Sequence, residues 1–188
     1  LRIAISQPDT FKLCGINVRN ADLDYMKYMV RYDSTFGRFQ GELDTYEQGL
    51  IINGQKIPVF SESDASLIPW DSCGAEYIID ATGAYCTTQK AMDHLQGGAK
   101  KVIISAPAKD EETPTFIMGV NHTEYNSDMP VVSNASCTTN CLAPICKILE
   151  DNYGIEYGLM STIHAATAKQ NRFTLTDYYD QLQQLKGM

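Results

Sequence analysis

Short apolar segments rich in β-branched residues alternate with segments of helical periodicity along most of this 188-residue chain. This alternation is typical of α/β domains, in which helices cover a largely parallel sheet. Residues 41–60 instead predict a hairpin that turns at Asn53-Gly54. The remaining predicted strands are 1–5, 11–18, a buried strand at 76–80, 101–105, 115–120, 130–133 and 157–163, and the predicted helices are 22–30, 87–95 and about 138–151.

The connection between the first two predicted strands is too short for a parallel crossover. Only residues 6–10 join them, whereas neighbouring parallel strands need a crossover of at least about 10–12 residues. Either the two segments pair antiparallel through a Pro8-Asp9 turn, or one of them lies outside the sheet. In both cases the first βαβ unit is truncated. The chain also contains no Gly-x-Gly-x-x-Gly turn of the kind that binds a pyrophosphate.

Composition narrows the class of protein. With 44% hydrophobic residues the chain can form a real core, and its net charge of −8 argues against nucleic acid as a partner. No apolar run approaches membrane-spanning length, and the first five residues are too short for a signal peptide. The six cysteines form no Cys-x-x-Cys pair, so we expect free thiols, no metal site and a cytoplasmic location.

Cys137 stands where a predicted strand gives way to a predicted helix, within the run Ser133-Asn-Ala-Ser-Cys-Thr-Thr-Asn-Cys-Leu-Ala-Pro144. A thiol at a helix N-terminus lies near unpaired backbone N–H groups and the positive end of the helix dipole, which favour the thiolate. The predicted strand at 157–163 leads to His164, 27 residues after Cys137. A cysteine and a histidine on adjacent elements are typical of covalent catalysis through a thiolate.

This run, with residues 161–168, resembles the active-site block of phosphorylating glyceraldehyde-3-phosphate dehydrogenases. The likeness extends to residues 32–37, 74–77, 81–85 and 97–107 and covers about 11–170. It implies a Rossmann-like, dinucleotide-binding-type domain over residues 1–170 that ends in the cysteine and histidine block. Residues 171–188 predict an amphipathic C-terminal helix that covers apolar surface, with a partner-binding helix as the alternative.

The resemblance implies a role for each residue of this block. Cys137 would attack an aldehyde, and His164 would pair with the thiolate and then act as general base. Asn134 and the backbone near Cys137 would help fix the thiolate and the oxyanion. Cys141 is expected to be structural, although a disulfide with Cys137 is conceivable, and Cys146 is expected in the core.

Phosphate groups are the second ligand that the resemblance implies. Ser136 and Thr138 match the hydroxyls that bind the attacking inorganic phosphate, and Ser136 can also cap the helix. Thr167 matches a contact to the phosphate of the substrate. Lys169 stands where the family commonly has a second threonine, and it would contact phosphate through its charge.

The cofactor implied is NAD or NADP. The usual acidic residue after the second strand is replaced by Val18, and the neighbouring Arg19 either accommodates a 2′-phosphate or is a solvated loop residue. Tyr85 is either a cofactor contact or a packing residue. The candidate cofactor-binding residues are Asn17, Arg19, Thr82, Gly83, Tyr85 and Ser105.

Three functional hypotheses remain open. The first is a glycolytic dehydrogenase that takes an aldehyde phosphate and inorganic phosphate and forms a homo-oligomer. The second is a truncated relative that keeps a reactive thiol without turnover, and the third is a binding or structural module with the C-terminal helix as its contact. His94 and His122 have no support from the motifs and are interpreted as surface or structural residues.

Overall fold

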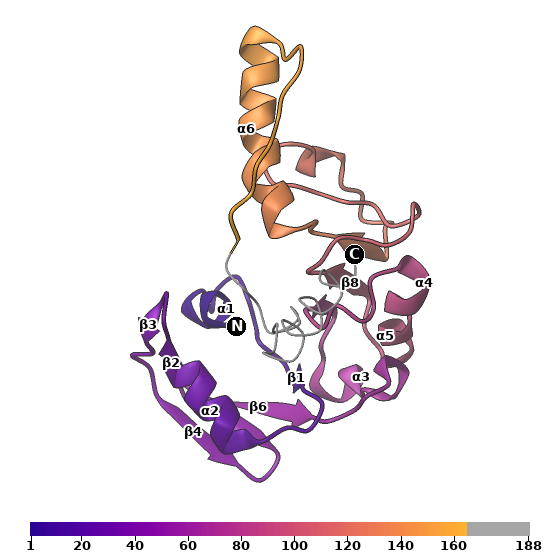
Figure 1. The fold of residues 1–188 in the computed structure, drawn as a ribbon. Coiled ribbons are helices and arrows are strands. Elements are labelled where there is room, and N and C mark those ends of the chain that lie inside the picture. Colours follow the sequence, from indigo (N-terminus) through magenta and orange to yellow (C-terminus); the bar gives the residue numbers. More distant parts are fainter. Residues whose placement is uncertain (165–188) are drawn as a thin grey trace, which may run out of the picture. The chain divides into compact units, whose positions relative to one another are not determined.

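The computed structural model describes residues 1–164, and the chain divides into two units, Leu1–Gly154 and Ile155–Met188. The first unit contains every helix and strand assigned in the described part of the chain (Figure 1). The predicted C-terminal helix and the predicted domain boundary near residue 170 lie outside the described residues. Among residues 1–164, no helix has both the length and the apolar character needed to span a membrane.

The first unit contains a parallel sheet of three strands in the order β7-β8-β9, which are Tyr77–Asp80, Lys101–Ile104 and Val131–Ser133. In this register Asp80 is opposite Ile104, and Ile104 is opposite Ser133. The three carboxyl ends therefore meet at one edge of the sheet. The parallel α/β pattern predicted from the sequence is confirmed here.

One face of this sheet is buried, and the other is exposed at β7 and half-buried at β8 and β9. Ile78, Val102 and Val131 lie in a core, whereas Tyr77 and Ile79 of β7 are 63% and 70% exposed. The prediction of a buried strand at 76–80 was therefore right for one face only, because an apolar run does not tell which face a neighbouring element covers. The buried members of this core are Ala65, Ile68, Trp70, Ala75, Ile78, Cys86, Ala91, Ala99, Val102, Ile104 and Val131.

Short helices contribute to this core. They are η1 (Ala65–Leu67), α3 (Trp70–Cys73), α4 (Thr88–Ala91) and α5 (Asp93–Gln96). The Thr87 hydroxyl accepts a hydrogen bond from the Lys90 amide and so caps α4. The single helix predicted over 87–95 is divided at Met92 into α4 and α5.

A second sheet has the order β1-β6-β5-β4, formed by Ile16–Asn17, Gln55–Phe60, Gly49–Ile52 and Leu43–Tyr46. The predicted hairpin is confirmed, and both Asn53 and Gly54 have positive φ, as a tight turn between two strands requires. The helix predicted over 22–30 is confirmed as α2 (Leu23–Arg31), which is capped by Asp22 and packs on this sheet. The buried residues of this second core are Val30, Leu43, Leu50, Ile52 and Ile57.

The N-terminal prediction is corrected by the structure. Residues 1–5 do not form a strand but belong to α1 (Arg2–Ser6), so the alternative in which one segment lies outside the sheet is the one observed. The guanidinium of Arg2 fixes this helix by donating to the carbonyl oxygens of Val30 and Gly37. The predicted strand at 11–18 contracts to β1, which pairs parallel with β6.

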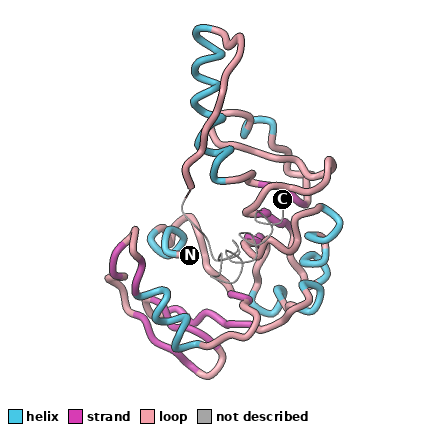
Figure 2. The backbone as a smooth tube through the Cα atoms, in the orientation of Figure 1, coloured by secondary structure: helices cyan, strands magenta, loops and turns pink. Residues whose placement is uncertain are grey.

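Two further predicted strands are absent from the described residues. Segment 115–120 makes only one β-bridge, between Thr115 and Ser133, and residues 157–163 are irregular (Figure 2). The other short elements are β2 (Tyr32–Asp33), β3 (Gly37–Arg38) and η2 (His122–Glu124). Local β-propensity at 115–120 and 157–163 was a poor guide because a strand also needs a partner strand.

Helix α6 (Cys137–Tyr153) follows β9 directly and contains Pro144. None of its residues is buried, and Ile145, Ile148 and Tyr153 are among its exposed apolar side chains. Cys146, predicted to be a core residue, is only half-buried.

Leu50→Ala is expected to lower the free energy of unfolding by about 2–5 kcal/mol, because it leaves a cavity at a fully buried position. Leu67→Ala makes the same change at a side chain that is 65% exposed, and its effect should stay below about 0.5 kcal/mol. Urea unfolding followed by circular dichroism measures both. Equal losses in the two variants would contradict the assignment of the second core.

Candidate active site

The turn between β9 and α6 places Cys137 at the first residue of the helix. Ala135 has a φ of +56°, which is uncommon for a residue with a side chain. Its amide donates to the Ser133 hydroxyl at 3.0 Å, and that buried hydroxyl donates to the Ala106 carbonyl at 2.7 Å. These bonds hold the chain in the left-handed conformation that starts the helix.

The first turn of α6 is capped by side chains. The Ser136 hydroxyl accepts from the Thr139 amide at 3.0 Å and lies 2.7 Å from the Thr139 hydroxyl. The Asn140 amide group donates to the carbonyl oxygens of Asn134 and Ser136 at 2.7 and 2.9 Å. The capping role considered for Ser136 is thus observed. Thr139 and Asn140 were missed, although their positions three and four residues after the cap are typical of residues that support a first turn.

The Cys137 side chain is exposed at this position and is not enclosed by apolar side chains. It lines a pocket between the carboxyl ends of β8 and β9 and the start of α6. Ligands of open α/β sheets bind at such carboxyl ends. The pocket is lined by Ser105, Ala106, Pro107, Asn134, Ala135, Ser136, Cys137 and Asn140. The structure therefore brings Ser105, Asn134, Ser136 and Cys137 together, and Thr138 follows on the same helical turn.

The remaining residues of the predicted catalytic block lie outside this unit. His164 is exposed and belongs to the unit Ile155–Met188, and the strand predicted to carry it is irregular. Its pairing with Cys137 stays a prediction. Thr167 and Lys169 lie outside the described residues.

The predicted cofactor residues lie at the end of β1 and in the loops that follow β1, β7 and β8. The Asn17 side chain is bonded at 2.9 Å to both the amide and the carbonyl of Glu62, so it joins the end of β1 to the loop after β6. Arg19 is exposed. The Tyr85 hydroxyl accepts from the Ala65 amide at 3.0 Å and donates to the Ser63 carbonyl at 3.2 Å. In this structure Asn17 and Tyr85 thus support the loops, which is the packing role considered for Tyr85.

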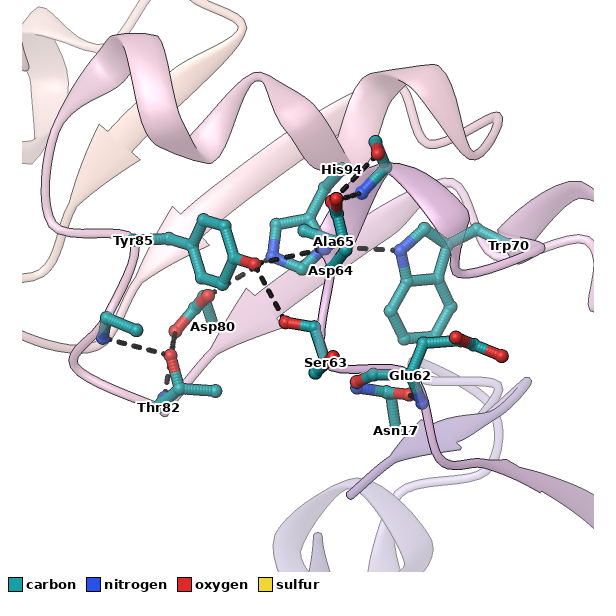
Figure 3. A network of polar contacts seen from close by, with 12 residues as sticks. Asn17, Glu62, Ser63, Asp64, Ala65, Trp70, Asp80, Thr82, Tyr85 and His94 are labelled. Atoms are coloured by element: carbon teal, nitrogen blue, oxygen red, sulfur yellow. Dashed lines mark hydrogen bonds and ion pairs between the residues drawn. The ribbon is translucent and has the colours of Figure 1, made fainter. Parts of the chain in front are cut away.

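A buried polar cluster supports the turn after β7, and Figure 3 shows it. The Trp70 indole Nε1–H donates to His94 Nδ1 at 3.2 Å, and His94 Nε2 lies 3.1 Å from Asp80 Oδ2. Asp80 Oδ1 accepts from the amide and the hydroxyl of Thr82 at 2.8 and 2.7 Å. His94 is therefore structural, as one of the two interpretations held, whereas the partners Trp70 and Asp80 carried no signal in the sequence.

Burial and hydrogen bonding act in opposite directions on Asp80. Burial raises the pKa of this carboxyl group, but the hydrogen bonds from the His94 side chain and from Thr82 outweigh it, so the pKa lies below the ordinary value. Asp80 is only 3% exposed, so its charge is stabilised by these bonds rather than by solvent.

The fold defines an α/β protein with a parallel sheet, and its candidate site carries an exposed thiol at the carboxyl edge of that sheet, where such folds bind ligands. Comparisons with known proteins agree with this class. Residues 1–88 match the family model described as the NAD binding domain of glyceraldehyde 3-phosphate dehydrogenase, and residues 136–183 match the model of its C-terminal domain. The chain belongs to the glyceraldehyde-3-phosphate dehydrogenase family.

Curated relatives lead to the same family. The chain is 54% identical to glyceraldehyde-3-phosphate dehydrogenase of Aspergillus oryzae over 169 residues, which are 90% of this chain and 49% of the relative. It is 56% identical to the Aspergillus niger protein over 156 residues, which are 83% of this chain and 46% of that protein. The cytosolic protein of Gracilaria gracilis is 50% identical over 170 residues, 90% of this chain and 50% of that protein. The chain thus spans about half the length of the curated relatives it matches.

Cys137 is expected to react with iodoacetamide about tenfold faster than Cys141 at pH 7, because only Cys137 lies at the helix N-terminus. Cys141 is a built-in control: it is also exposed, on the same helix, four residues further on. Buried Cys86 should react last. Peptide mass spectrometry after timed quenching gives the rates, and equal rates at 137 and 141 would contradict the expectation.

Asp80→Asn should lower the free energy of unfolding at pH 7 by about 1.5–3 kcal/mol, since it weakens hydrogen bonds to a charged acceptor. Because the folded-state pKa of Asp80 is lowered, its stabilisation is present above the unfolded-state pKa of about 3.9 and is lost as pH falls through the folded-state value. The difference in the free energy of unfolding between wild type and variant should therefore narrow below about pH 4. Urea unfolding at several pH values measures this difference, with the exposed Asp9→Asn as control. A difference that does not change with pH would contradict the interpretation.

Proposed function

We propose that this chain works as a phosphorylating glyceraldehyde-3-phosphate dehydrogenase, the glycolytic enzyme whose name its relatives carry. One observation carries the proposal: Cys137 is exposed at the first residue of α6 and lines the pocket at the carboxyl ends of β8 and β9. A thiolate at this position is accessible to the carbonyl carbon of a substrate that enters from solvent. It lies next to the sheet edge at which α/β folds hold their ligands.

The proposed chemistry begins with addition of the Cys137 sulfur to the aldehyde carbon of glyceraldehyde 3-phosphate, which gives a hemithioacetal. His164 removes the proton of the new hydroxyl group. A dinucleotide held at the sheet edge would supply the acceptor for the hydride of that carbon. Inorganic phosphate then attacks the resulting thioester, the carbon–sulfur bond breaks, and Cys137 leaves as a thiolate with an acyl phosphate as the product.

Two groups of residues would bind phosphate. Ser136 and Thr138 stand at the N-terminus of α6, where backbone N–H groups and the helix dipole favour an anion, and we assign them to the inorganic phosphate. We assign Thr167 and Lys169 to the phosphate of the substrate. With a chain of net charge −8, attraction for phosphate has to be local.

Two places at the sheet edge suit parts of the dinucleotide, although the chain contains no Gly-x-Gly-x-x-Gly turn for its pyrophosphate. The pocket beside Ser105 and Asn134 adjoins the thiol, so it suits the nicotinamide end, and the loop of Thr82 and Gly83 follows β7 at the same edge of the sheet. The match to an NAD binding domain model favours NAD over NADP. Exposed Arg19 is the feature that would admit NADP.

The location and the assembly belong to the same proposal. We assign the protein to the cytoplasm, as the name of the Gracilaria gracilis relative states for that protein. We also expect it to form a homo-oligomer. No feature of residues 1–164 favours the alternative of a binding module without chemistry.

A coupled assay tests the activity. With glyceraldehyde 3-phosphate, phosphate and NAD, we expect absorbance at 340 nm to rise, and Cys137→Ser should lower the rate by roughly 10³-fold or more, because it removes the nucleophile. Cys141→Ser, one turn along the same exposed helix, is the matched control and should keep the rate within about twofold of the original.

Calorimetric titration with NAD and with NADP accompanies this assay. Tighter binding of NAD is expected, and binding weaker than millimolar for both would contradict the proposed function for this chain. A rate that survives Cys137→Ser would contradict the role of the thiol.

A further inference from the structure

Hydrogen bonds connect the loops at three strand ends into one network (Figure 3). Asn17, the last residue of β1, is bonded to Glu62 in the loop after β6. Tyr85 links residues 63–65 of that same loop to the turn after β7. Asp80, at the end of β7, is in turn bonded to His94 and Thr82. The turn at residues 81–85 is therefore fixed from both of its ends.

The direction of each bond in the buried part is determined by chemistry. An indole N–H can only donate, so His94 Nδ1 must be the unprotonated acceptor of the bond from Trp70. A neutral imidazole then carries its proton on Nε2 and donates it to Asp80 Oδ2. Although the two groups lie within ion-pair distance, the contact is a hydrogen bond from a neutral ring, because a protonated Nδ1 would face the indole N–H.

This tautomer leaves Asp80 as a charged acceptor for the turn. Its Oδ1 receives the Thr82 amide and hydroxyl, and the Thr82 oxygen accepts from the Ala84 amide at 3.1 Å. Between these two residues Gly83 has a φ of +71°, a left-handed conformation that suits glycine. The bonds thus converge on the Asp80 carboxylate, with Trp70 and His94 donating toward it from the core and Thr82 and Ala84 donating toward it from the turn.

Burial separates the two ends of this chain of bonds. Trp70, His94 and Asp80 are 6%, 5% and 3% exposed, whereas Thr82 is exposed. The Phe60 ring packs edge-on against Trp70 at a centroid distance of 5.9 Å, and the Tyr85 ring lies 5.2 Å from His94. The buried residues cannot touch a ligand, but they can set the geometry of residues that do.

We propose that Trp70, His94 and Asp80 form a positioning relay that holds the turn at residues 81–85 in the geometry needed to bind the dinucleotide. This inference rests on the proposed function, which assigns Thr82 and Gly83 to the cofactor. The relay residues themselves are positioning residues and not cofactor contacts. Nothing in their local sequence patterns links them, since 24 residues separate Trp70 from His94 and 14 separate His94 from Asp80.

The test compares His94→Leu, which removes both ring nitrogens, with His94→Gln, which keeps an N–H group for Asp80. Two quantities are measured: hydrogen–deuterium exchange at the Thr82 and Ala84 amides by NMR, and the Kd for NAD by calorimetry. In His94→Leu the exchange rates of these amides and the Kd for NAD are both expected to rise about tenfold, because a hydrogen bond to a charged acceptor is lost. In His94→Gln both should return to within about threefold of the original values.

The matched control is His122→Leu, the same change at an exposed histidine outside the relay, which should alter neither quantity. Trp70 is the only tryptophan of the chain, so the indole N–H signal in resonance Raman spectra reports directly on the first bond of the relay. That signal should show a weaker hydrogen bond in His94→Leu. If His94→Leu does not fold, Trp70→Phe is used instead, because it removes only the indole donor. It should raise the exchange rates of the same amides to a smaller extent.

The outcomes separate the relay from the proposed function. If the folded His94→Leu chain exchanges Thr82 and Ala84 at the original rates, the relay is refuted. If these amides exchange faster while the NAD affinity stays unchanged, the link to the dinucleotide is refuted. If the original chain binds no NAD, the proposed function fails for this chain, and amide exchange alone decides whether the relay positions the turn.

Discussion

The parallel pairing of β7, β8 and β9 is the constraint on which the rest of the structure depends. It places Asp80, Ile104 and Ser133 in one row, so the segments that leave the three strands start from the same edge of the sheet. Burial of one face, through residues such as Val102 and Val131, fixes this register, because a shift by one residue would turn the apolar side chains toward solvent. The candidate site forms at this edge of the sheet because the strand ends meet there.

Two residues of the row act on the site in different ways. Ser133 is buried, and its hydroxyl bonds hold Ala135 in the left-handed turn that begins α6 and presents Cys137. Asp80 is also buried, and its carboxylate holds the turn that carries Thr82. In each case a polar group that is costly to bury is fully hydrogen-bonded, and it fixes the backbone of an exposed segment. The thiol-bearing helix and the proposed cofactor turn are thus positioned by two strand ends of the same sheet.

Several elements were predictable because their signals are local. The cap of α2 at Asp22, the Asn53-Gly54 turn and the start of α6 after Ser136 each depend on side chains within a few residues of one another. The segments 1–5, 115–120 and 157–163 were wrongly predicted as strands for the converse reason, since apolar β-rich residues form strands only where a partner backbone is available. The relay could not be predicted, because its members come from separate elements.

The sequence by itself determined the α/β class, the family resemblance and the position of Cys137 at a strand-to-helix junction, since periodicity, capping and motif are properties of consecutive residues. Only the tertiary structure decided that Cys137 is exposed, that α1 lies outside the sheet, and that His94 is a buried neutral acceptor between Trp70 and Asp80. Burial and tautomer depend on contacts between residues far apart in the chain. No local pattern encodes those contacts.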